Sequence, residues 1–252
     1  MMGSQSLFNY VLSLGDDALI IAQRLSEWAY KAPYLEEDIA LSNISLDMFG
    51  RANLFLEYAA SLKKEVITAD DLAFKRSERE FTNCLINEQP NGNFAETMVR
   101  QFFLDAYKKL FLEQLINSND KQLSAIAQKS IKETNYHIRH SSNWMLRLGD
   151  GTEISHAKAQ SAINDLWTFT GELFEMTENE EEMAKKKIGV DCQELKSNWD
   201  EIMNDVFKKA TLSRPKDGHM KTGGRRGIHT EHLGHMLSDM QYLQRAHPDA
   251  KW

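Results

Sequence analysis

Residues 41–62, LSNISLDMFGRANLFLEYAASL, decide the fold class of this 252-residue chain. Its apolar residues recur at alternating steps of three and four, which is the spacing that places side chains on one side of an α-helix. The stripe consists of Leu41, Ile44, Met48, Ala52, Phe55, Ala59 and Leu62. No segment shows a convincing period-2 alternation, so a long amphipathic helix is predicted here and a sheet is not.

Three further stretches carry the same helical periodicity. They predict helices over about 16–33, 93–111 and 123–148, which Pro33, Asn93 and Gly149 help to delimit. Shorter helices are expected at 75–88, 155–176, 195–211 and 229–246, and 178–187 (ENEEEMAKKK) is expected to be a solvated helix face. We therefore predict an all-α, long four-helix bundle with additional C-terminal helices. It should be a single domain over 1–252, with residues 1–6 disordered or left over from cloning.

The composition excludes several classes of protein. The formal net charge is −7, and an acidic chain is a poor ligand for phosphate backbones, so no nucleic-acid partner is expected. No apolar run is long enough to span a bilayer, and the N-terminus lacks the pattern of a secretory signal. Cys84 and Cys192 lie far apart without metal-type spacing, as expected of free thiols in a reducing compartment. We expect a cytoplasmic protein without a membrane partner.

Each long helix carries an acid near its apolar stripe. Ferritin-like dimetal proteins place a Glu on each of two helices and a Glu-x-x-His on each of the other two, because two metal ions need bridging carboxylates and imidazoles. Here the expected histidines are replaced by glycine and tyrosine. The sequence thus predicts a ferritin-like bundle without a metal, whose vestigial dimetal positions are Asp17, Asp47, Gly50, Asp105, Glu133 and Tyr136.

Three interpretations of these acids stay open. They could be structural acids paired with cations, a weak or mononuclear metal site with one nitrogen from His137, or an active dimetal site. Pairing is favoured because an unpaired buried charge costs several kcal/mol. The nearby candidates for partners are Arg51, Lys108, Arg139 and His137, and we expect Glu133 to be buried.

The C-terminal region offers two further candidates. His229, His232 and His235 recur at steps of three, so on one helix face they could bind zinc or pack the start of the helix. Residues 222–227, TGGRRG, could touch an anion or a partner, but they follow no evident strand and lack the Lys-Ser/Thr of a P-loop.

Several segments in order resemble the family of C subunits of bacterial phenylacetyl-CoA epoxidases (phenylacetate-CoA oxygenases) over nearly the whole chain. They are residues 14–16 (LGD), 23–28 (QRLSEW), 88–95 (EQPNGNFA), 136–141 (YHIRHS), 147–152 (RLGDGT), 222–234 (TGGRRGIHTEHLG) and 240–245 (MQYLQR). His235 is not part of the family pattern.

The resemblance implies a ferritin-like fold and a non-catalytic structural subunit, without catalytic residues or a cofactor of its own. In such an epoxidase, the di-iron centre belongs to the A subunit of the oxygenase, which forms a heterodimer or a higher hetero-oligomer with the C subunit. A reductase subunit with flavin and iron–sulfur groups supplies electrons from NADPH. Phenylacetyl-CoA and dioxygen then yield the ring epoxide during aerobic phenylacetate degradation.

The resemblance also implies contacts with the acyl-CoA at the subunit interface. These are expected at Glu36, Glu80, Phe81, Thr82 and Asn83. Two alternatives remain, namely a self-sufficient ferritin-like dimetal oxygenase or other metal-binding protein, and a homomeric storage protein. Gly50 and Tyr136 at ligand positions argue against both.

Overall fold

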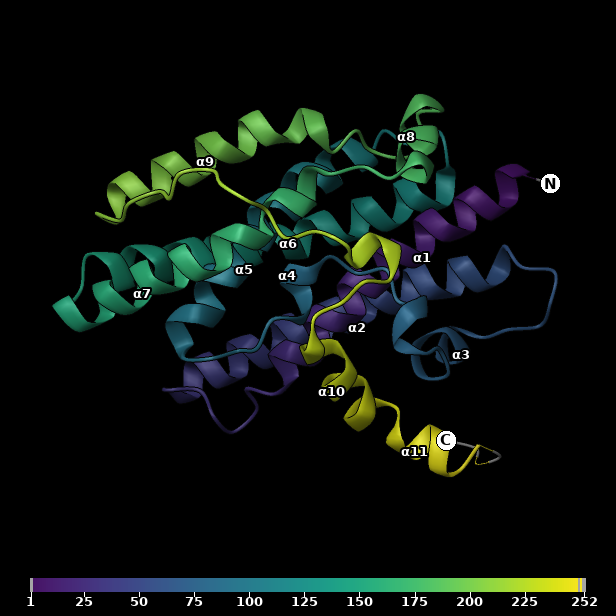
Figure 1. Cartoon of the computed structure of the whole chain (residues 1–252), viewed down its shortest axis with the longest axis horizontal. Coiled ribbons are helices and arrows are strands. Elements are labelled where there is room, and N and C mark those ends of the chain that lie inside the picture. Colours follow the sequence, from purple (N-terminus) through teal and green to yellow (C-terminus); the bar gives the residue numbers. More distant parts are fainter. Residues whose placement is uncertain (1, 249, 251–252) are drawn as a thin grey trace. The chain divides into compact units, whose positions relative to one another are not determined.

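A computed structural model of the chain describes residues 2–248 and 250, with side chains from residue 5 onward. Every regular element among them is an α-helix or a short 3-10 helix, which confirms the all-α prediction (Figure 1). Contacts between residues divide the chain into two compact units. Unit 1 comprises the residues up to Pro90 together with those from Gly223 onward, and unit 2 comprises Asn91–Thr222.

Unit 1 is built on two long helices that pack side by side, α1 (Met2–Ser26) and α2 (Leu35–Ser61) (Figure 1). The buried residues of α2 include the predicted stripe from Leu41 to Ala59, and Ser45 of α2 donates a hydrogen bond to the carbonyl of Ala22 in α1 at 2.8 Å. The smaller elements of the unit are α3 (Ala69–Phe74), η1 (Glu78–Glu80), α4 (Leu85–Glu88), η5 (Gly224–Arg226), α10 (Glu231–Met240) and α11 (Tyr242–Ala246).

Unit 2 is built on α5 (Phe94–Leu115) and α6 (Lys121–Gly149), which pack against each other. Asn93 caps α5 as predicted, because its side chain accepts from the amides of Ala95 and Glu96 and so satisfies two otherwise free donors. The remaining elements are α7 (Glu153–Leu166), η2 (Trp167–Phe169), η3 (Gly171–Phe174), α8 (Glu178–Lys185), η4 (Gln193–Leu195) and α9 (Lys196–Lys209).

An aromatic cluster forms part of the core of unit 2. The ring of Phe103 in α5 lies 5.8 Å from Trp199 of α9 and 5.6 Å from Trp167, in edge-on geometries that suit the ring quadrupoles. The indole Nε1 of the fully buried Trp199 donates to the carbonyl of Phe103 at 3.0 Å. This one side chain therefore joins α9 to α5 through both packing and a hydrogen bond.

Several predicted helix boundaries are wrong. The helix expected from residue 16 begins at Met2, so residues 2–6, for which disorder was predicted, are helical. Residues 75–88 hold only the short elements η1 and α4, and the helix expected over 155–176 gives way to 3-10 turns after Leu166. The helix at 195–211 is confirmed with shifted ends, and α8 confirms the helix within 178–187. The single helix predicted over 229–246 is divided at Gln241 into α10 and α11. The single domain over 1–252 stays a prediction.

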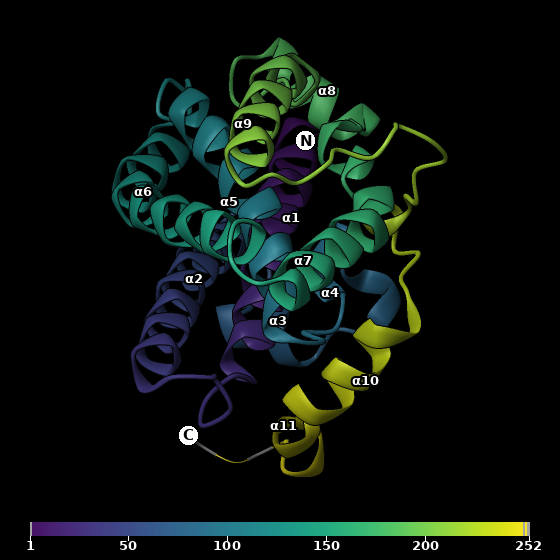
Figure 2. The ribbon, with the colours of Figure 1, turned by 90° about the vertical axis from the view of Figure 1, so that its left-hand side faces the viewer.

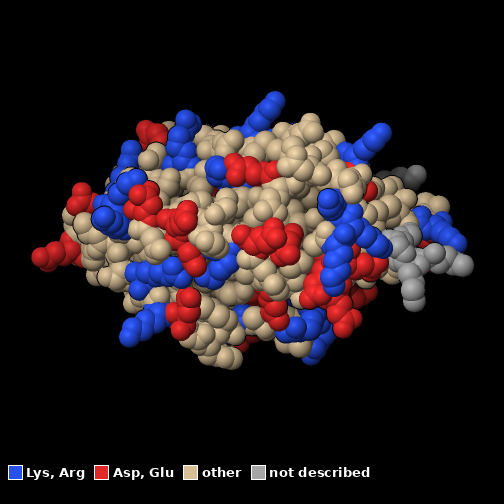
Figure 3. Space-filling model, turned by 90° about the horizontal axis from the view of Figure 1, so that it is seen from above, with Lys and Arg blue, Asp and Glu red and all other residues tan. Residues whose placement is uncertain are grey.

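The surface and the helices carry two features that bear on function. Lysine and arginine side chains are interspersed with aspartate and glutamate over the face that Figure 3 shows, without separation by sign. Within the described part of the chain, no helix combines the length and the apolar character needed to cross a membrane.

Candidate functional site

Three buried carboxylates define the polar interior of unit 1. Asp16 and Asp17 lie on α1, Glu88 ends α4, and each is at most 1% exposed. A carboxylate removed from water is stable only when cations and hydrogen-bond donors surround it. The donors come from two places in the sequence, residues 76–87 and the segment 223–246, which we call the C-terminal segment.

Asp17 is held by the C-terminal segment. Arg225 donates to both of its oxygens, at 2.8 Å and 3.1 Å, in the two-pronged geometry that makes guanidinium–carboxylate pairs strong. The amide of Cys84 and the side chain of Asn87 donate to Oδ1 at 2.9 Å and 2.7 Å. Arg225 also donates to the carbonyl of Thr82 at 2.8 Å, so it ties three segments of unit 1 together.

Asp16, the neighbouring acid, is paired with a different arginine. Arg76 donates to both carboxylate oxygens, and its Nη1 lies 3.0 Å from Oδ2. The amide and the hydroxyl of Thr82 donate to the same oxygen at 2.9 Å and 3.0 Å. The guanidinium lies over the ring of Phe81, 4.1 Å from its centroid, which adds a cation–π contact.

Glu88 binds the segment that leads into α10. Its Oε1 accepts from the amide and the hydroxyl of Thr230 at 2.6 Å and 2.7 Å. Its Oε2 accepts from Asn83 at 2.9 Å and lies 2.8 Å from Nδ1 of His229. Arg24 of α1 donates to the backbone carbonyl of Glu88 at 2.8 Å and 3.0 Å. Glu88 thus joins α4 and α1 to the start of α10.

The surroundings of His229 favour its protonated form. Its Nε2 lies 2.9 Å from the carbonyl of Phe81, so both ring nitrogens face acceptors and both are satisfied only when protonated. Burial lowers the pKa of His229, but the hydrogen bonds to the Glu88 carboxylate and the Phe81 carbonyl outweigh it, and the net pKa is raised. A protonated His229 therefore complements the charge of Glu88.

Two glycines let the C-terminal segment approach closely. A Cβ on Gly224 would lie 2.1 Å from the carbonyl oxygen of Asn83. Gly227 has φ +69°, in the left-handed region, and a Cβ there would lie 2.3 Å from the carbonyl of Arg79. Residues 222–227, predicted as a possible anion-binding loop, instead bring Arg225 to Asp17.

The structure distributes the predicted dimetal acids over both units. Asp17 and Asp47 belong to unit 1, whereas Asp105 and Glu133 belong to unit 2. Asp105 is fully buried and accepts from Ser141 at 2.8 Å and Gln101 at 3.3 Å. Asp47 and Glu133 are only half-buried, so the prediction that Glu133 is buried is wrong. Asp17 is paired with Arg225, a cation that the sequence did not single out as a partner.

The residues at the predicted histidine positions do not fit a dimetal centre. Gly50 is exposed on the side of α2 opposite to its buried stripe, where an added Cβ would meet nothing within 4 Å. Tyr136 is 41% exposed. A cation beside Asp17 would meet the guanidinium of Arg225, which lies 2.8 Å from the carboxylate. Among residues 5–248, no three His, Cys, Asp or Glu side chains are grouped to hold a metal ion. The metal-free prediction itself stays a prediction.

The three C-terminal histidines do not form one site. Helix α10 begins at Glu231, so His229 lies before it. The two ring nitrogens of His229 contact Glu88 and the carbonyl of Phe81. His232 is half-buried within α10 and His235 is exposed. The zinc interpretation of this face is therefore wrong for His229.

The predicted acyl-CoA contacts differ in accessibility. Glu36 is exposed in the first turn of α2, and Glu80 is exposed at the end of η1. Hydrogen bonds from the hydroxyl and the amide of Ser77 lower the pKa of Glu80. Phe81 and Asn83 are fully buried and Thr82 is half-buried. The contacts themselves stay a prediction.

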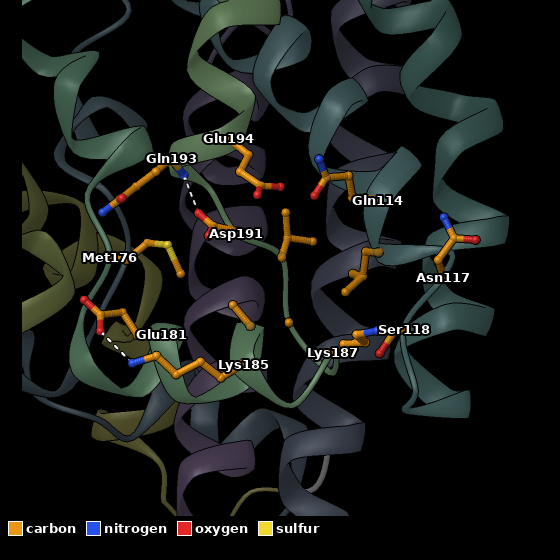
Figure 4. A pocket seen from close by; sticks show the side chains of 14 residues that line it. Gln114, Asn117, Ser118, Met176, Glu181, Lys185, Lys187, Asp191, Gln193 and Glu194 are labelled. Carbon is orange, nitrogen blue, oxygen red and sulfur yellow. Dashed lines mark hydrogen bonds and ion pairs between the residues drawn. The ribbon is translucent and has the colours of Figure 1, made fainter.

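A hollow in unit 2, which the sequence did not predict, has a volume of about 690 Å³ (Figure 4). It lies between the end of α5, helix α8 and the connection to η4. Its charged groups are of both signs, and Lys185 is bound to Glu181 at 3.2 Å in its wall. Its charge therefore selects neither anions nor cations. The polar side chains that line it include Gln114, Asn117, Ser118, Asp191, Gln193 and Glu194.

The long antiparallel helices and the inward acids are those of a ferritin-like all-α protein. Residues 2–252 match the model of the family described as "Phenylacetic acid catabolic protein", and the chain belongs to this family. It is 49% identical over 243 residues to the C subunit of the 1,2-phenylacetyl-CoA epoxidase of Escherichia coli (strain K12). The alignment covers 96% of this chain and 98% of that protein, which confirms the resemblance found in the sequence.

Proposed function

We propose that this chain is a non-catalytic structural subunit of a multicomponent phenylacetyl-CoA epoxidase. In this role it pairs with the di-iron A subunit, called the catalytic subunit below, and stabilises it during aerobic phenylacetate degradation. The similarity to the C subunit of the Escherichia coli epoxidase supports the assignment to the complex. The observation that carries the non-catalytic role is the pairing of Asp17 with Arg225 at 2.8 Å.

That pairing matters because a metal ligand must offer lone pairs to a cation. Oδ1 of Asp17 already accepts from Cys84 and Asn87, and Arg225 donates to both oxygens. Binding a metal there would displace a buried guanidinium and leave it without its partner, which is costly. Gly50, at one of the two histidine positions, has no side chain to offer.

The redox groups belong to other subunits in this proposal. The catalytic subunit holds the di-iron centre, and the reductase subunit holds flavin and iron–sulfur groups that pass on electrons from NADPH. The acyl-CoA would meet this chain at the subunit interface through Glu36 and residues 80–83, of which Glu80 and Thr82 are the accessible members. The complex works in the cytoplasm.

Co-expression tests this role. The catalytic subunit, expressed by itself, should be poorly soluble or inactive, and adding this chain should restore both properties. The measurement is size-exclusion chromatography followed by oxygen uptake with phenylacetyl-CoA and the reductase. Full activity of the catalytic subunit with the reductase but without this chain would contradict the structural role.

Iron analysis separates this proposal from a self-sufficient dimetal oxygenase. The purified chain, refolded with excess ferrous iron and dialysed, should retain well under one iron per chain, because Gly50 and Tyr136 replace the histidines. Two tightly held irons per chain would support the oxygenase instead.

A further inference from the structure

One side of helix α2 is apolar although its side chains are exposed. Leu35, Ile39 and Leu46 are 73%, 53% and 65% exposed. Steps of four and seven residues place them on one side of the helix, opposite to the stripe that packs in unit 1. Figure 2 shows α1 and α3 together on one side of α2.

The connection before α2 carries two exposed aromatic residues. Tyr30 is fully exposed and Tyr34 is 62% exposed. Tyr30 has φ +64°, a left-handed conformation that is uncommon and strained for an aromatic residue. Contiguous apolar patches of about 300–600 Å² are the largest on typical monomers and are often functional. We call this surface the α2 apolar face; it consists of Tyr30, Tyr34, Leu35, Ile39 and Leu46.

Gly50 continues the same side of the helix, one turn beyond Leu46. A glycine inside a helix is destabilising relative to alanine, and internal crowding can justify it. Crowding does not explain Gly50, because an added Cβ would meet no atom within 4 Å. A bare backbone on an apolar helix face permits the close approach of a helix from another chain, as small residues do between packed helices.

The charges around this face favour a particular partner. Glu36, Glu37, Asp38, Asp47 and Glu57 are the acids of α2, and all are at least partly exposed. The single base in α2 is Arg51, which is buried. Two copies of this face would place acids against acids, so a second copy of the chain is a poor occupant.

We propose that the α2 apolar face is the docking surface for the catalytic subunit, which presents there an apolar helix face bordered by lysine and arginine. The inference rests on the proposed function for the identity of the partner. The apolar stripe supplies the buried centre of the contact, and the acidic border matches a basic rim. Gly50 marks the point at which the two helices approach most closely.

A charge placed in the centre of the face gives the first test. The wild-type chain, Leu46→Glu and the control Val66→Glu are titrated into the purified catalytic subunit, and the Kd is measured by calorimetry. Val66 is fully exposed outside any helix, so its variant adds the same charge away from the face. Leu46→Glu should weaken binding by about thirtyfold or more, as loss of a central contact does, and Val66→Glu should bind within twofold of the wild type.

Gly50→Ala gives a second test that a folding defect cannot imitate. Alanine improves the helix, so the melting temperature of the chain alone should rise by about 2–4 °C. The added methyl group obstructs the approaching helix, so the Kd for the catalytic subunit should rise about tenfold. A more stable chain that binds less well supports the docking surface.

The outcomes separate the two proposals. If the wild-type chain does not bind the catalytic subunit, the proposed function fails and the docking surface fails with it. If the wild type binds and both face variants bind equally well, the function stands and the α2 apolar face is not the docking surface. If light scattering shows that the chain alone dimerises and Leu46→Glu abolishes the dimer, the occupant is a second copy and the proposal is overturned.

Discussion

The two units use different means to hold their interiors together. In unit 1, the carboxylates of Asp16, Asp17 and Glu88 are buried and bound by arginine, histidine and backbone amides. In unit 2, the rings of Phe103 and Trp199 pack edge-on within an aromatic cluster. The ion pairs of unit 1 thus contrast with the aromatic cluster of unit 2, although unit 2 also buries Asp105.

The difference has a consequence for stability. The C-terminal segment supplies Arg225 to Asp17, and His229 and Thr230 to Glu88, so it is held to the rest of unit 1 by charged groups as well as by packing. Buried ion pairs are strongly unfavourable when one partner is removed, whereas an aromatic cluster loses stability in proportion to the volume deleted. Unit 1 should therefore respond to charge and pH, and unit 2 to shape.

The largest effect is expected from Arg225→Met. The variant leaves Asp17 buried without its cation, and the free energy of unfolding should fall by about 3–5 kcal/mol. Chemical denaturation followed by circular dichroism measures the change. The control is Arg226→Met, at the exposed neighbouring position, which should lower the free energy of unfolding by less than about 1 kcal/mol. Equal costs for the two variants would show that the pair with Asp17 is unimportant.

A smaller cost is expected in unit 2 from Trp199→Phe. The phenyl ring fills less volume and cannot donate to the carbonyl of Phe103, so the loss should be about 1–3 kcal/mol. This cost should change little between pH 6 and pH 8, because the hydrogen bond that is lost joins two neutral groups, although the Nζ of Lys196 lies 5.8 Å from the centre of the Trp199 ring. Trp144→Phe, at a half-buried position, is the control and should cost less. If the cost of Trp199→Phe depended strongly on pH, the proposed difference between the two units would be wrong.

The pH dependence of unit 1 gives a third and smaller effect. The pKa of His229 is raised in the folded chain, so its contribution is full below the unfolded pKa and is lost as pH rises through the folded value. Stability should therefore decline over that range in the wild type. His229→Gln should remove the part of this decline that is due to His229 and leave the rest of the pH dependence of stability unchanged. An identical decline in both proteins would exclude His229 as its source.

The smallest effect concerns the cap of α3, away from both interiors. Thr68→Ala removes the hydroxyl that accepts from the Asp71 amide and should cost about 1 kcal/mol in thermal unfolding. The hydrogen bond from Lys75, followed by those from the amide and the hydroxyl of Thr68, lowers the pKa of Asp71 to about 2. The contribution of Asp71 should thus persist above pH 4 and fade as pH falls towards 2. Titration of Asp71 near its ordinary value in the folded chain would contradict this.

The helices were predictable because their stripes are local patterns. The apolar spacing of 41–62 matches the buried side of α2, and Asn93 is a residue type that typically caps the N-terminus of a helix, as it does at α5. A helix was wrongly predicted over residues 75–88 because some of their amides donate hydrogen bonds to residues far away in the sequence. The amides of Thr82 and Cys84 donate to Asp16 and Asp17 instead of to helix carbonyls. A tertiary contact here overrides local propensity.

The candidate site was predictable only in part. Asp17 stands out because an acid interrupts an apolar stripe, but its partner Arg225 lies 208 residues away. Spacing along one helix therefore pointed to local cations such as Arg51. The glycines beside Arg225 were a usable signal of close backbone approach, although the sequence does not say to what. Gly50 was noticed as a missing ligand, whereas the structure places it on the exposed side of α2.

The central claim is that the buried carboxylate of Asp17 supports the fold and takes no part in metal binding. The double variant Asp17→Asn/Arg225→Gln removes both charges together, so it avoids leaving one of them buried alone. The most direct measurement is the iron content and the turnover per assembled epoxidase complex that contains this variant. We expect both to equal the wild-type values at equal yield of complex. A loss of iron, or of turnover, in complexes that assemble normally would contradict the structural role of this chain.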